Sequence, residues 1–230
     1  MFVYFDLDDT LLDHSHAERM ALADVRDRYL EVFGALSVDE LQAQYHAINA
    51  PLWRRYAEGE IDKQTLKDRR FAALLAEVGA PHANPALVRR YYMRRYGHHW
   101  RFVSGAQAAY EAVAEQGPVG VMTNGFAEVQ AQKLDTFPVL EERAETVVVC
   151  EEVGALKPDP AVFAHATEQA GVEPDEVLYV GDSYRSDVEG ARRAGWRVAW
   201  FAPDGTDGRS VEDRGFAFAD WDELLARLRG

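Results

Sequence analysis

The chain has 230 residues, of which 47% are hydrophobic and 28% are charged, as in an ordinary globular protein of one or two domains. Its formal net charge of −14 argues against a surface that follows the phosphates of a nucleic acid polymer, because such surfaces need clustered Lys and Arg. No stretch approaches the roughly 20 apolar residues of a membrane span, and the first residues lack the pattern of a secretory signal. We therefore expect no nucleic acid polymer and no membrane as partners, and a cytoplasmic location.

Five short apolar runs predict strands that are buried on both faces: residues 2–5, 118–122, 146–149, 177–180 and 197–201. From about residue 103 onward the strands alternate with helical patterns, which favours a parallel sheet with crossover helices. In such sheets, functional residues gather at the carboxyl ends of the strands.

The segment between the first two strands has helical periodicity without convincing strands, and its helices are expected at residues 17–33, 38–56, 63–78 and 84–96. It is too long for a simple crossover between neighbouring strands. The sequence therefore predicts an α/β fold, with a Rossmann-like parallel-sheet core from residues 1–13 and 101–230 and an inserted all-helical cap domain over residues 14–100.

Two rare residue types narrow the possible chemistry. The single cysteine, Cys150, excludes an internal disulfide and a cysteine-rich metal site, and we expect a buried thiol because it ends an apolar run. Since the chain has few lysines, a lysine in a chemically useful place is less easily explained by chance; the four are Lys63, Lys67, Lys133 and Lys157.

An acidic run, Asp6-Leu7-Asp8-Asp9-Thr10, directly follows the first predicted strand. On its own, such a cluster fits a turn or a helix cap as well as a chemical site. After the strand at 118–122 comes Thr123-Asn124-Gly125, whose hydroxyl and glycine suit binding of a phosphate oxygen. A strand-to-helix turn capped by Thr123 or Asn124 is the structural alternative for this second segment.

Two further segments lie in the second half of the chain. Lys157-Pro158 precedes an expected helix start near residue 161, and the lysine could be solvated or could act as a point charge on a phosphate. The segment from Gly181 to Asp187 follows the strand at 177–180, so Asp182 lies at a strand end and Asp187 is expected in the first turn of the next helix.

Together the segments place five carboxylates around one edge of the sheet: Asp6, Asp8, Asp9, Asp182 and Asp187. Crowded carboxylates raise one another's pKa unless a cation compensates. Ligands that are all oxygen favour a hard ion such as Mg²⁺, which binds through one or two carboxylates, waters and a substrate phosphate. With Lys157 nearby, the pattern predicts a Mg²⁺ site for an anionic substrate.

These four segments, in this order, resemble the motifs of the haloacid dehalogenase (HAD) superfamily of phosphotransferases, and residues 14–100 are similar to its helical C1-type cap. The resemblance implies a phosphatase in which Asp6 attacks phosphorus and forms an aspartyl-phosphate. It implies that Asp8 protonates the leaving oxygen and then takes a proton from water. Mg²⁺ would be held by the Asp6 carboxylate, the Asp8 backbone carbonyl and Asp182, with Asp187 in support through water.

The same resemblance assigns the groups that bind the transferring phosphoryl. The side chains are those of Thr123 and Lys157. The backbone groups are those around Leu7, Asp8, Asn124 and Gly125. Asp8 also favours phosphate-ester hydrolysis over carbon–halogen cleavage, because the dehalogenase branch of the superfamily typically lacks this second aspartate. Asp9 is interpreted as a turn or supporting residue.

A narrower resemblance concerns the substrate. The chain looks like the bacterial pyrimidine-nucleotide 5′-phosphatases at several segments: Asn49-Ala50-Pro51-Leu52-Trp53, Tyr56, Gly59, Arg70-Phe71, Thr123-Asn124-Gly125-Phe126 and Glu151-Glu152-Val153-Gly154. It implies that nucleoside 5′-monophosphates are the small phosphorylated partner. Aromatic residues of the insert could stack on a base or could simply pack as core: Tyr45, Trp53, Tyr56, Tyr91, Tyr92 and Trp100.

Two alternatives to a nucleotidase stay open. One is a phosphatase for sugar phosphates or other small metabolites, because the Thr-Asn-Gly and Glu-Glu-Val-Gly segments also occur in a sugar-acid phosphatase relative. The other is a binding or regulatory protein that keeps the fold without turnover, which is disfavoured because competent residues fill every chemical position. A monomer or a weak homodimer is expected.

Overall fold

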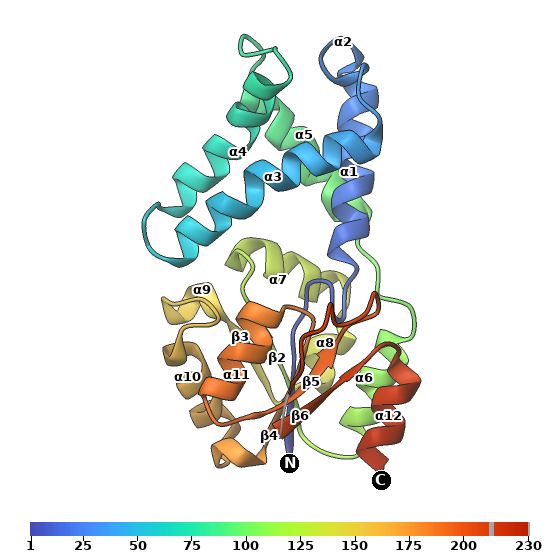
Figure 1. Ribbon diagram of the computed structural model, residues 1–230, viewed down its shortest axis with the longest axis vertical. Helices are drawn as coiled ribbons and strands as arrows, with labels where there is room; N and C mark the ends of the chain where they lie inside the picture. Colours follow the sequence, from blue (N-terminus) through green and yellow to red (C-terminus); the bar gives the residue numbers. More distant parts are fainter. Residues whose placement is uncertain (212–213, 230) are drawn as a thin grey trace. The chain divides into compact units, whose positions relative to one another are not determined.

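The computed structural model describes residues 1–211 and 214–229 (Figure 1). The chain divides into two compact units. The core unit is built from Met1–Asp13 and Phe102–Gly230, and the helical unit is His14–Arg101. Within the described residues, none of the helices has the length and apolar character needed to cross a membrane.

A six-stranded parallel sheet forms the centre of the core unit, in the order β3-β2-β1-β4-β5-β6. The strands are β1 (Phe2–Phe5), β2 (Val119–Thr123), β3 (Thr146–Val149), β4 (Val177–Gly181), β5 (Arg197–Phe201) and β6 (Gly215–Phe218). The predicted fold class, a parallel Rossmann-like core with an all-helical insertion, is confirmed. Because β1 is central, its carboxyl end is flanked by those of β2 and β4.

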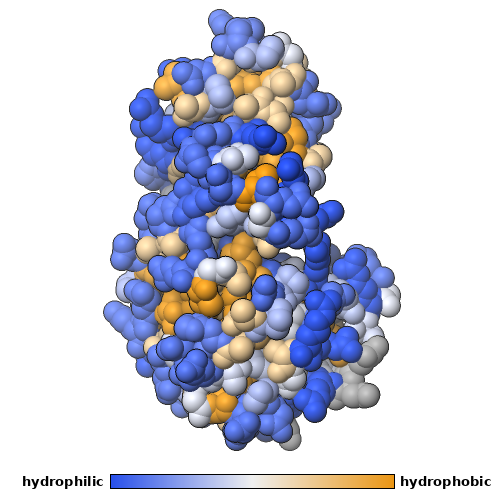
Figure 2. Space-filling view, turned by 90° about the vertical axis from the view of Figure 1, so that its left-hand side faces the viewer, coloured by the Kyte–Doolittle hydropathy of each residue, from blue (hydrophilic) through white to orange (hydrophobic). Residues whose placement is uncertain are grey.

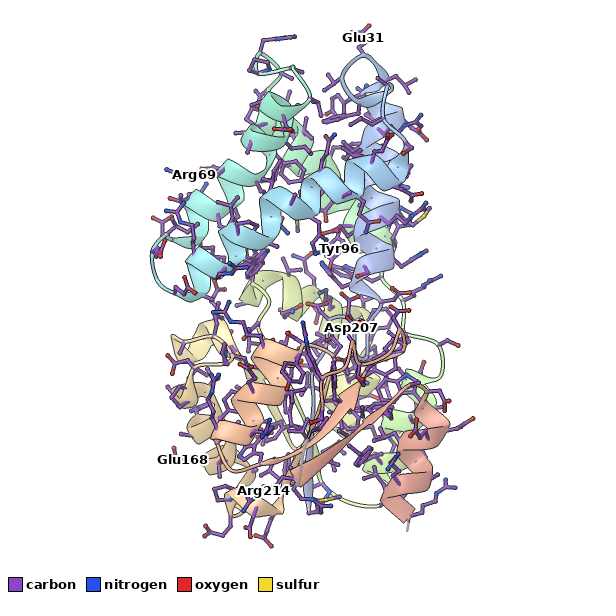
Figure 3. The ribbon with its side chains drawn as sticks, in the orientation of Figure 1. Glu31, Arg69, Tyr96, Glu168, Asp207 and Arg214 are labelled. Atoms are coloured by element: carbon purple, nitrogen blue, oxygen red, sulfur yellow. The ribbon has the colours of Figure 1, made fainter. Side chains whose placement is uncertain are left out.

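Helices cover both faces of this sheet, because alternate residues along each strand point to opposite faces (Figure 1). On one face lie α6 (Ala106–Ala114), α7 (Ala127–Thr136), α8 (Val139–Arg143) and α12 (Trp221–Arg229). There the Phe5 ring meets Tyr110 edge-on at 5.3 Å. On the other face lie α10 (Pro160–Ala170) and α11 (Glu189–Arg193), and Tyr4 stacks on Trp196 at 5.4 Å. The exposed Glu168 extends outward from α10 (Figure 3).

The described part of the core unit also contains three short elements: α9 (Cys150–Val153), a 3₁₀ turn η1 (Pro174–Glu176) and a single π-helical turn η2 (Tyr184–Val188). Cys150 is buried, as expected from the sequence. Asp187 lies in the first turn of the next helix, as expected, and this helix is the π-helical turn η2, which precedes α11. π-helical turns of this kind are frequent at functional sites.

The five predicted strands are present, with β2 shifted by one residue and β4 extended to Gly181. The edge strand β6 was not predicted. Only its last residue, Phe218, is buried, so it lacks the continuous apolar run by which the other strands were found.

The helical unit contains α1 (His14–Arg28), α2 (Leu30–Phe33), α3 (Val38–Ala57), α4 (Lys63–Glu77) and α5 (Pro85–His98). The single helix predicted over residues 17–33 is wrong, because Tyr29 leaves the helical conformation (φ −124°, ψ 52°) and separates α1 from α2. The other helices begin where side-chain oxygens accept backbone N–H groups, at Ser37, Asp62 and Asn84.

Aromatic rings form the interior of this unit. Tyr45, Phe71 and Tyr92 are buried with ring centroids 5.1 to 5.5 Å apart. Tyr96 of α5 is directed toward α1, where its hydroxyl lies 2.7 Å from His14 Nδ1 (Figure 3). The remaining aromatic candidates are only partly buried: Trp53, Tyr56, Tyr91 and Trp100. Hydrophilic residues cover most of the face seen in Figure 2, in keeping with the strong net charge.

Candidate active site

The loop after β1 holds the first acidic run in a fixed turn. Asp6 N–H donates to the Val180 carbonyl at 2.8 Å, which continues the pairing of β1 with β4. Leu7 is fully buried and anchors the loop between the two carboxylates that flank it. Asp9 adopts a left-handed conformation (φ 57°), and its N–H donates to the Leu12 carbonyl at 2.7 Å. The interpretation of Asp9 as a turn residue is confirmed.

Lys157 lies at the centre of the site, buried with its ammonium among acceptors. Nζ donates to Asp6 Oδ1 at 2.7 Å, to Asp187 Oδ1 at 2.8 Å and to the Tyr179 hydroxyl. The Tyr179 hydroxyl donates in turn to the Met122 carbonyl at 3.0 Å. Although burial opposes the charged form, the Asp187 and Asp6 carboxylates raise the pKa of Lys157 well above its usual value. The ammonium is therefore a permanent positive charge.

The backbone of Lys157 is fixed as firmly as its side chain. Asn124 Nδ2 donates to the Lys157 carbonyl at 2.9 Å, and Lys157 N–H donates to Asn124 Oδ1 at 2.7 Å. The Asn124 side chain is thus committed to positioning the lysine, and any direct role in phosphate binding falls to its backbone. The turn after β2 and the segment before α10 are joined by this pair of hydrogen bonds.

Asp6, Asp182 and Asp187 each offer a carboxylate oxygen within 4.8 Å of the others. Asp182 Oδ1 accepts a hydrogen bond from the buried Thr10 hydroxyl at 3.0 Å. Asp187 Oδ2 accepts from the Ser183 N–H at 2.9 Å. Gly181 makes this possible, because a Cβ there would lie 2.5 Å from Asp187 Oδ2.

The electrostatics of this cluster favour a bound cation. Burial, with a further contribution from Asp187, raises the pKa of Asp6 to about 7 against the opposing effect of Lys157. Burial and the neighbouring Asp187 and Asp6 carboxylates raise the pKa of Asp182 well above its ordinary value. Burial is the largest cause of both shifts, the neighbouring carboxylates add to it, and a nearby cation would favour the charged forms. A set of carboxylate oxygen ligands fits Mg²⁺.

Thr123, at the end of β2, presents a buried hydroxyl. Its Oγ1 accepts from Gln130 Nε2 at 2.7 Å, so its own hydrogen can be donated to an incoming oxygen. Gly125 provides the space for this contact, because a Cβ at that position would lie 1.9 Å from Gln130 Nε2.

Asp8 is held by α7, which sequence reasoning did not anticipate. The Lys133 ammonium forms an ion pair with Asp8 Oδ1, and Gln130 Nε2 donates to Asp8 Oδ2 at 2.9 Å. Tyr179 was also missed, since it stands in an apolar strand pattern. For Lys133, the scarcity of lysines was the one available signal.

The structure brings the predicted residues together to different degrees. One cluster, hereafter the strand-end cluster, contains the buried Asp6, Lys157 and Asp187 and the partly buried Asp182. Asp8 and Thr123 are bridged by Gln130. The buried side chain of Leu7 leaves only its backbone for binding phosphate.

A parallel sheet whose strand ends gather an aspartate, a buried lysine and carboxylates that could hold a metal ion is typical of Mg²⁺-dependent phosphoryl-transfer enzymes. The model of the haloacid dehalogenase-like hydrolase family matches residues 2–195. The chain belongs to this family of hydrolases.

Several known proteins are similar to this chain over most of their length. The HAD-hydrolase YfnB of Bacillus subtilis is 30% identical, over 87% of this chain and 83% of that protein. Its magnesium-bound crystal structure superimposes with a TM-score of 0.86 at 27% identity, covering 100% of this chain and 98% of that one. The pyrimidine 5′-nucleotidase YjjG of Escherichia coli is 28% identical, over 86% and 84%. The phosphoserine phosphatase of Thermus thermophilus is 30% identical, over 85% and 86%.

The chain is therefore an enzyme, a HAD phosphomonoesterase that uses Mg²⁺ and acts on a small phosphorylated substrate. Relatives of similar identity act on a nucleotide and on an amino-acid phosphate, so family membership alone does not select the substrate.

Proposed function

We propose that the enzyme hydrolyses nucleoside 5′-monophosphates, with a preference for pyrimidines, through an aspartyl-phosphate on Asp6. The observation that carries the catalytic part is the pairing of Asp6 with the buried Lys157 ammonium beside Asp182 and Asp187. This arrangement fixes a carboxylate at the end of a central strand, beside an ammonium that can pair with a phosphate and carboxylates that could hold Mg²⁺.

Asp6 is the nucleophile. Lys157 holds Oδ1, which fixes the rotation of the carboxylate and leaves Oδ2 to attack phosphorus in line with the leaving oxygen. A bond forms between Oδ2 and phosphorus as the ester P–O bond breaks. The Lys157 ammonium and the Thr123 hydroxyl donate to the phosphoryl oxygens as charge builds up on them.

Asp8 moves the protons. It gives a proton to the leaving oxygen, so that the nucleoside departs as an alcohol and Asp8 becomes a carboxylate. The carboxylate then takes a proton from the water that attacks the aspartyl-phosphate. Inorganic phosphate and free Asp6 result, and Asp8 again carries the proton.

The residues that would hold Mg²⁺ are the Asp6 carboxylate, the Asp8 backbone carbonyl and the Asp182 carboxylate, with Asp187 in support. When bound, Mg²⁺ supplies neutralisation of the charge shared by the phosphate and the carboxylates. Thr10 orients Asp182 for this role through its hydroxyl.

Two observations support a nucleotide as substrate. The relative YjjG acts on pyrimidine nucleotides. The helical unit carries aromatic rings that are not fully buried, including Trp53 and Tyr56 on α3, which meet edge to face at 5.7 Å. Partly exposed rings of this kind can stack on a base, whereas Tyr45 and Tyr92 serve as core.

A second candidate is a phosphatase for another small metabolite, such as a sugar phosphate or phosphoserine. The phosphoserine phosphatase from Thermus thermophilus, which is 30% identical, supports this second candidate.

A panel of substrates separates the two candidates. Purified protein with Mg²⁺ is assayed for phosphate release from UMP, dUMP, AMP, sugar phosphates and phosphoserine. We expect the highest kcat/KM for UMP or dUMP. Comparable values for the sugar phosphates, or a higher value for phosphoserine, would refute the nucleotide proposal and leave the mechanism untouched.

A further inference from the structure

We propose that Lys133, together with Gln130, is a positioning residue that holds the Asp8 carboxylate in the orientation needed for proton transfer to the leaving group. The inference rests on the proposed role of Asp8 and adds a residue set outside the strand-end cluster. It assigns a task to a buried lysine for which the mechanism above has no use.

The contacts account for both oxygens of Asp8. Lys133 pairs with Oδ1, and Gln130 donates to Oδ2 at 2.9 Å. Rotating or displacing the carboxylate would therefore break at least one of these contacts. Gln130 and Lys133 are three residues apart on α7, which places them on one face of the helix. Both side chains are buried, whereas the Asp8 side chain retains 28% of its exposure. Two donors on α7 therefore hold the carboxylate, while the Asp8 side chain stays partly exposed.

The cost of burial argues for a role beyond packing. Pairing with a carboxylate offsets part of the cost of burying an ammonium, and Lys133 pairs with Asp8. The pair therefore favours the arrangement in which Asp8 faces α7. When Asp8 has given its proton to the leaving oxygen, it is a carboxylate, and the two donors bind that form.

Gln130 also ties Asp8 to the phosphate-binding side of the site. Its single amide nitrogen reaches both Asp8 Oδ2 and Thr123 Oγ1. One helix therefore sets the position of the proton donor relative to a residue that contacts the transferring phosphoryl. This alignment is what in-line departure of the leaving group requires.

The test compares two esters of similar shape that differ in their need for an acid. Phenyl phosphate has a poor leaving group, and p-nitrophenyl phosphate has one that departs without protonation. For Lys133→Met we expect kcat/KM on phenyl phosphate to fall by about 10- to 100-fold and on p-nitrophenyl phosphate by less than about 3-fold. Lys133→Arg should restore most of the loss, because it also donates to Oδ1. Equal losses on both esters would overturn the proposal.

Three comparisons make the outcome unambiguous. Arg143→Met removes the same charge from an exposed position on α8 and should change neither ester's kcat/KM. In the Asp8→Asn background, Lys133→Met should cause no further loss on phenyl phosphate, and multiplicative losses would show that Lys133 acts independently of Asp8. Should Lys133→Met fail to fold, as judged by its thermal unfolding, Lys133→Gln provides the same ester comparison.

Asp8→Asn alone separates this inference from the proposed function. If Asp8→Asn shows no preference for the activated ester, the acid role of Asp8 is wrong. If Asp8→Asn shows the preference and Lys133→Met does not, the proposed function stands and the positioning role of Lys133 is wrong.

Discussion

The strand-end cluster and the α7 contact to Asp8 each contain a buried lysine, but the carboxylates that pair with the two lysines differ in number and exposure. Lys157 is enclosed and shared between the carboxylates of Asp6 and Asp187. Lys133 is equally buried, but it pairs with a carboxylate that remains partly exposed. A nucleophile gains from being immobile at a strand end, whereas a group that exchanges protons with a leaving oxygen and then with water must stay accessible. The two lysines therefore serve different needs at the same edge of the sheet: one fixes the nucleophile, and the other holds a group that stays accessible.

The largest expected difference in activity is between the Asp6→Asn and Asp8→Asn variants, one in the strand-end cluster and one at the α7 contact. Asp6→Asn removes the nucleophile and should reduce phosphate release from every ester to the background of the assay, because no covalent intermediate can form. Asp8→Asn should spare p-nitrophenyl phosphate in kcat/KM. Near-normal kcat for Asp6→Asn would contradict the covalent route.

Replacing the two lysines should lower the free energy of unfolding by different amounts. Lys157→Met leaves two buried carboxylates without their cation and should lower the free energy of unfolding by about 3 kcal/mol. Lys133→Met leaves one partly exposed carboxylate and should cost about 1 kcal/mol. Urea denaturation at pH 7.5 measures both. Equal losses would show that the enclosure of Lys157 has no energetic consequence.

Substitutions in the two regions should also differ in how they change the Mg²⁺ concentration needed for activity. Asp182→Asn removes a charged ligand and should raise the Mg²⁺ concentration for half-maximal activity by at least about 10-fold. Asp8→Asn should leave that concentration nearly unchanged, because Asp8 contributes its backbone carbonyl. Titration of activity with Mg²⁺ in each variant distinguishes the two. An unchanged requirement in Asp182→Asn would remove Asp182 from the metal site.

The smallest expected effect is on pH dependence. Burial raises the pKa of Asp6 from 3.8 to about 7. Without a divalent cation the folded state therefore binds more protons than the unfolded state between about pH 4 and 7, and the contribution of Asp6 to stability falls as pH rises through this range. Mg²⁺ must displace that proton at pH 5.5 but not at pH 8. The rise in Tm on adding Mg²⁺ should be larger at pH 8, and equal rises would contradict the shift.

The sequence was sufficient to predict five of the six strands and the four motifs, because each is local. An apolar run predicts a strand, and the polar residues that end it must lie at the carboxyl edge. The predicted strands 146–149 and 197–201 coincide with β3 and β5. The half-exposed β6 and the break at Tyr29 carry no comparable local pattern.

The parts of the site that could not be predicted depend on tertiary contacts. Lys133 and Asp8 are 125 residues apart in the chain, and nothing in either segment indicates the other. Tyr179 looks like any aromatic residue of a buried strand until its hydroxyl is placed beside the Lys157 ammonium. The contact of the Asn124 side chain with the backbone of Lys157 joins two distant segments, and neither segment indicates it locally.

Gly125 and Gly181 leave space in the site because they have no side chain. A methyl group at position 125 would occupy the place of Gln130, and one at position 181 would occupy the place of Asp187. Adding a single carbon at either position would therefore change neither charge nor polarity and would still displace a functional side chain. In another chain of this fold, a larger residue at position 125 indicates that α7 must contact Asp8 differently. A larger residue at position 181 indicates that the carboxylate cluster must be arranged differently. These two positions thus offer a steric signature for recognising which relatives keep this arrangement.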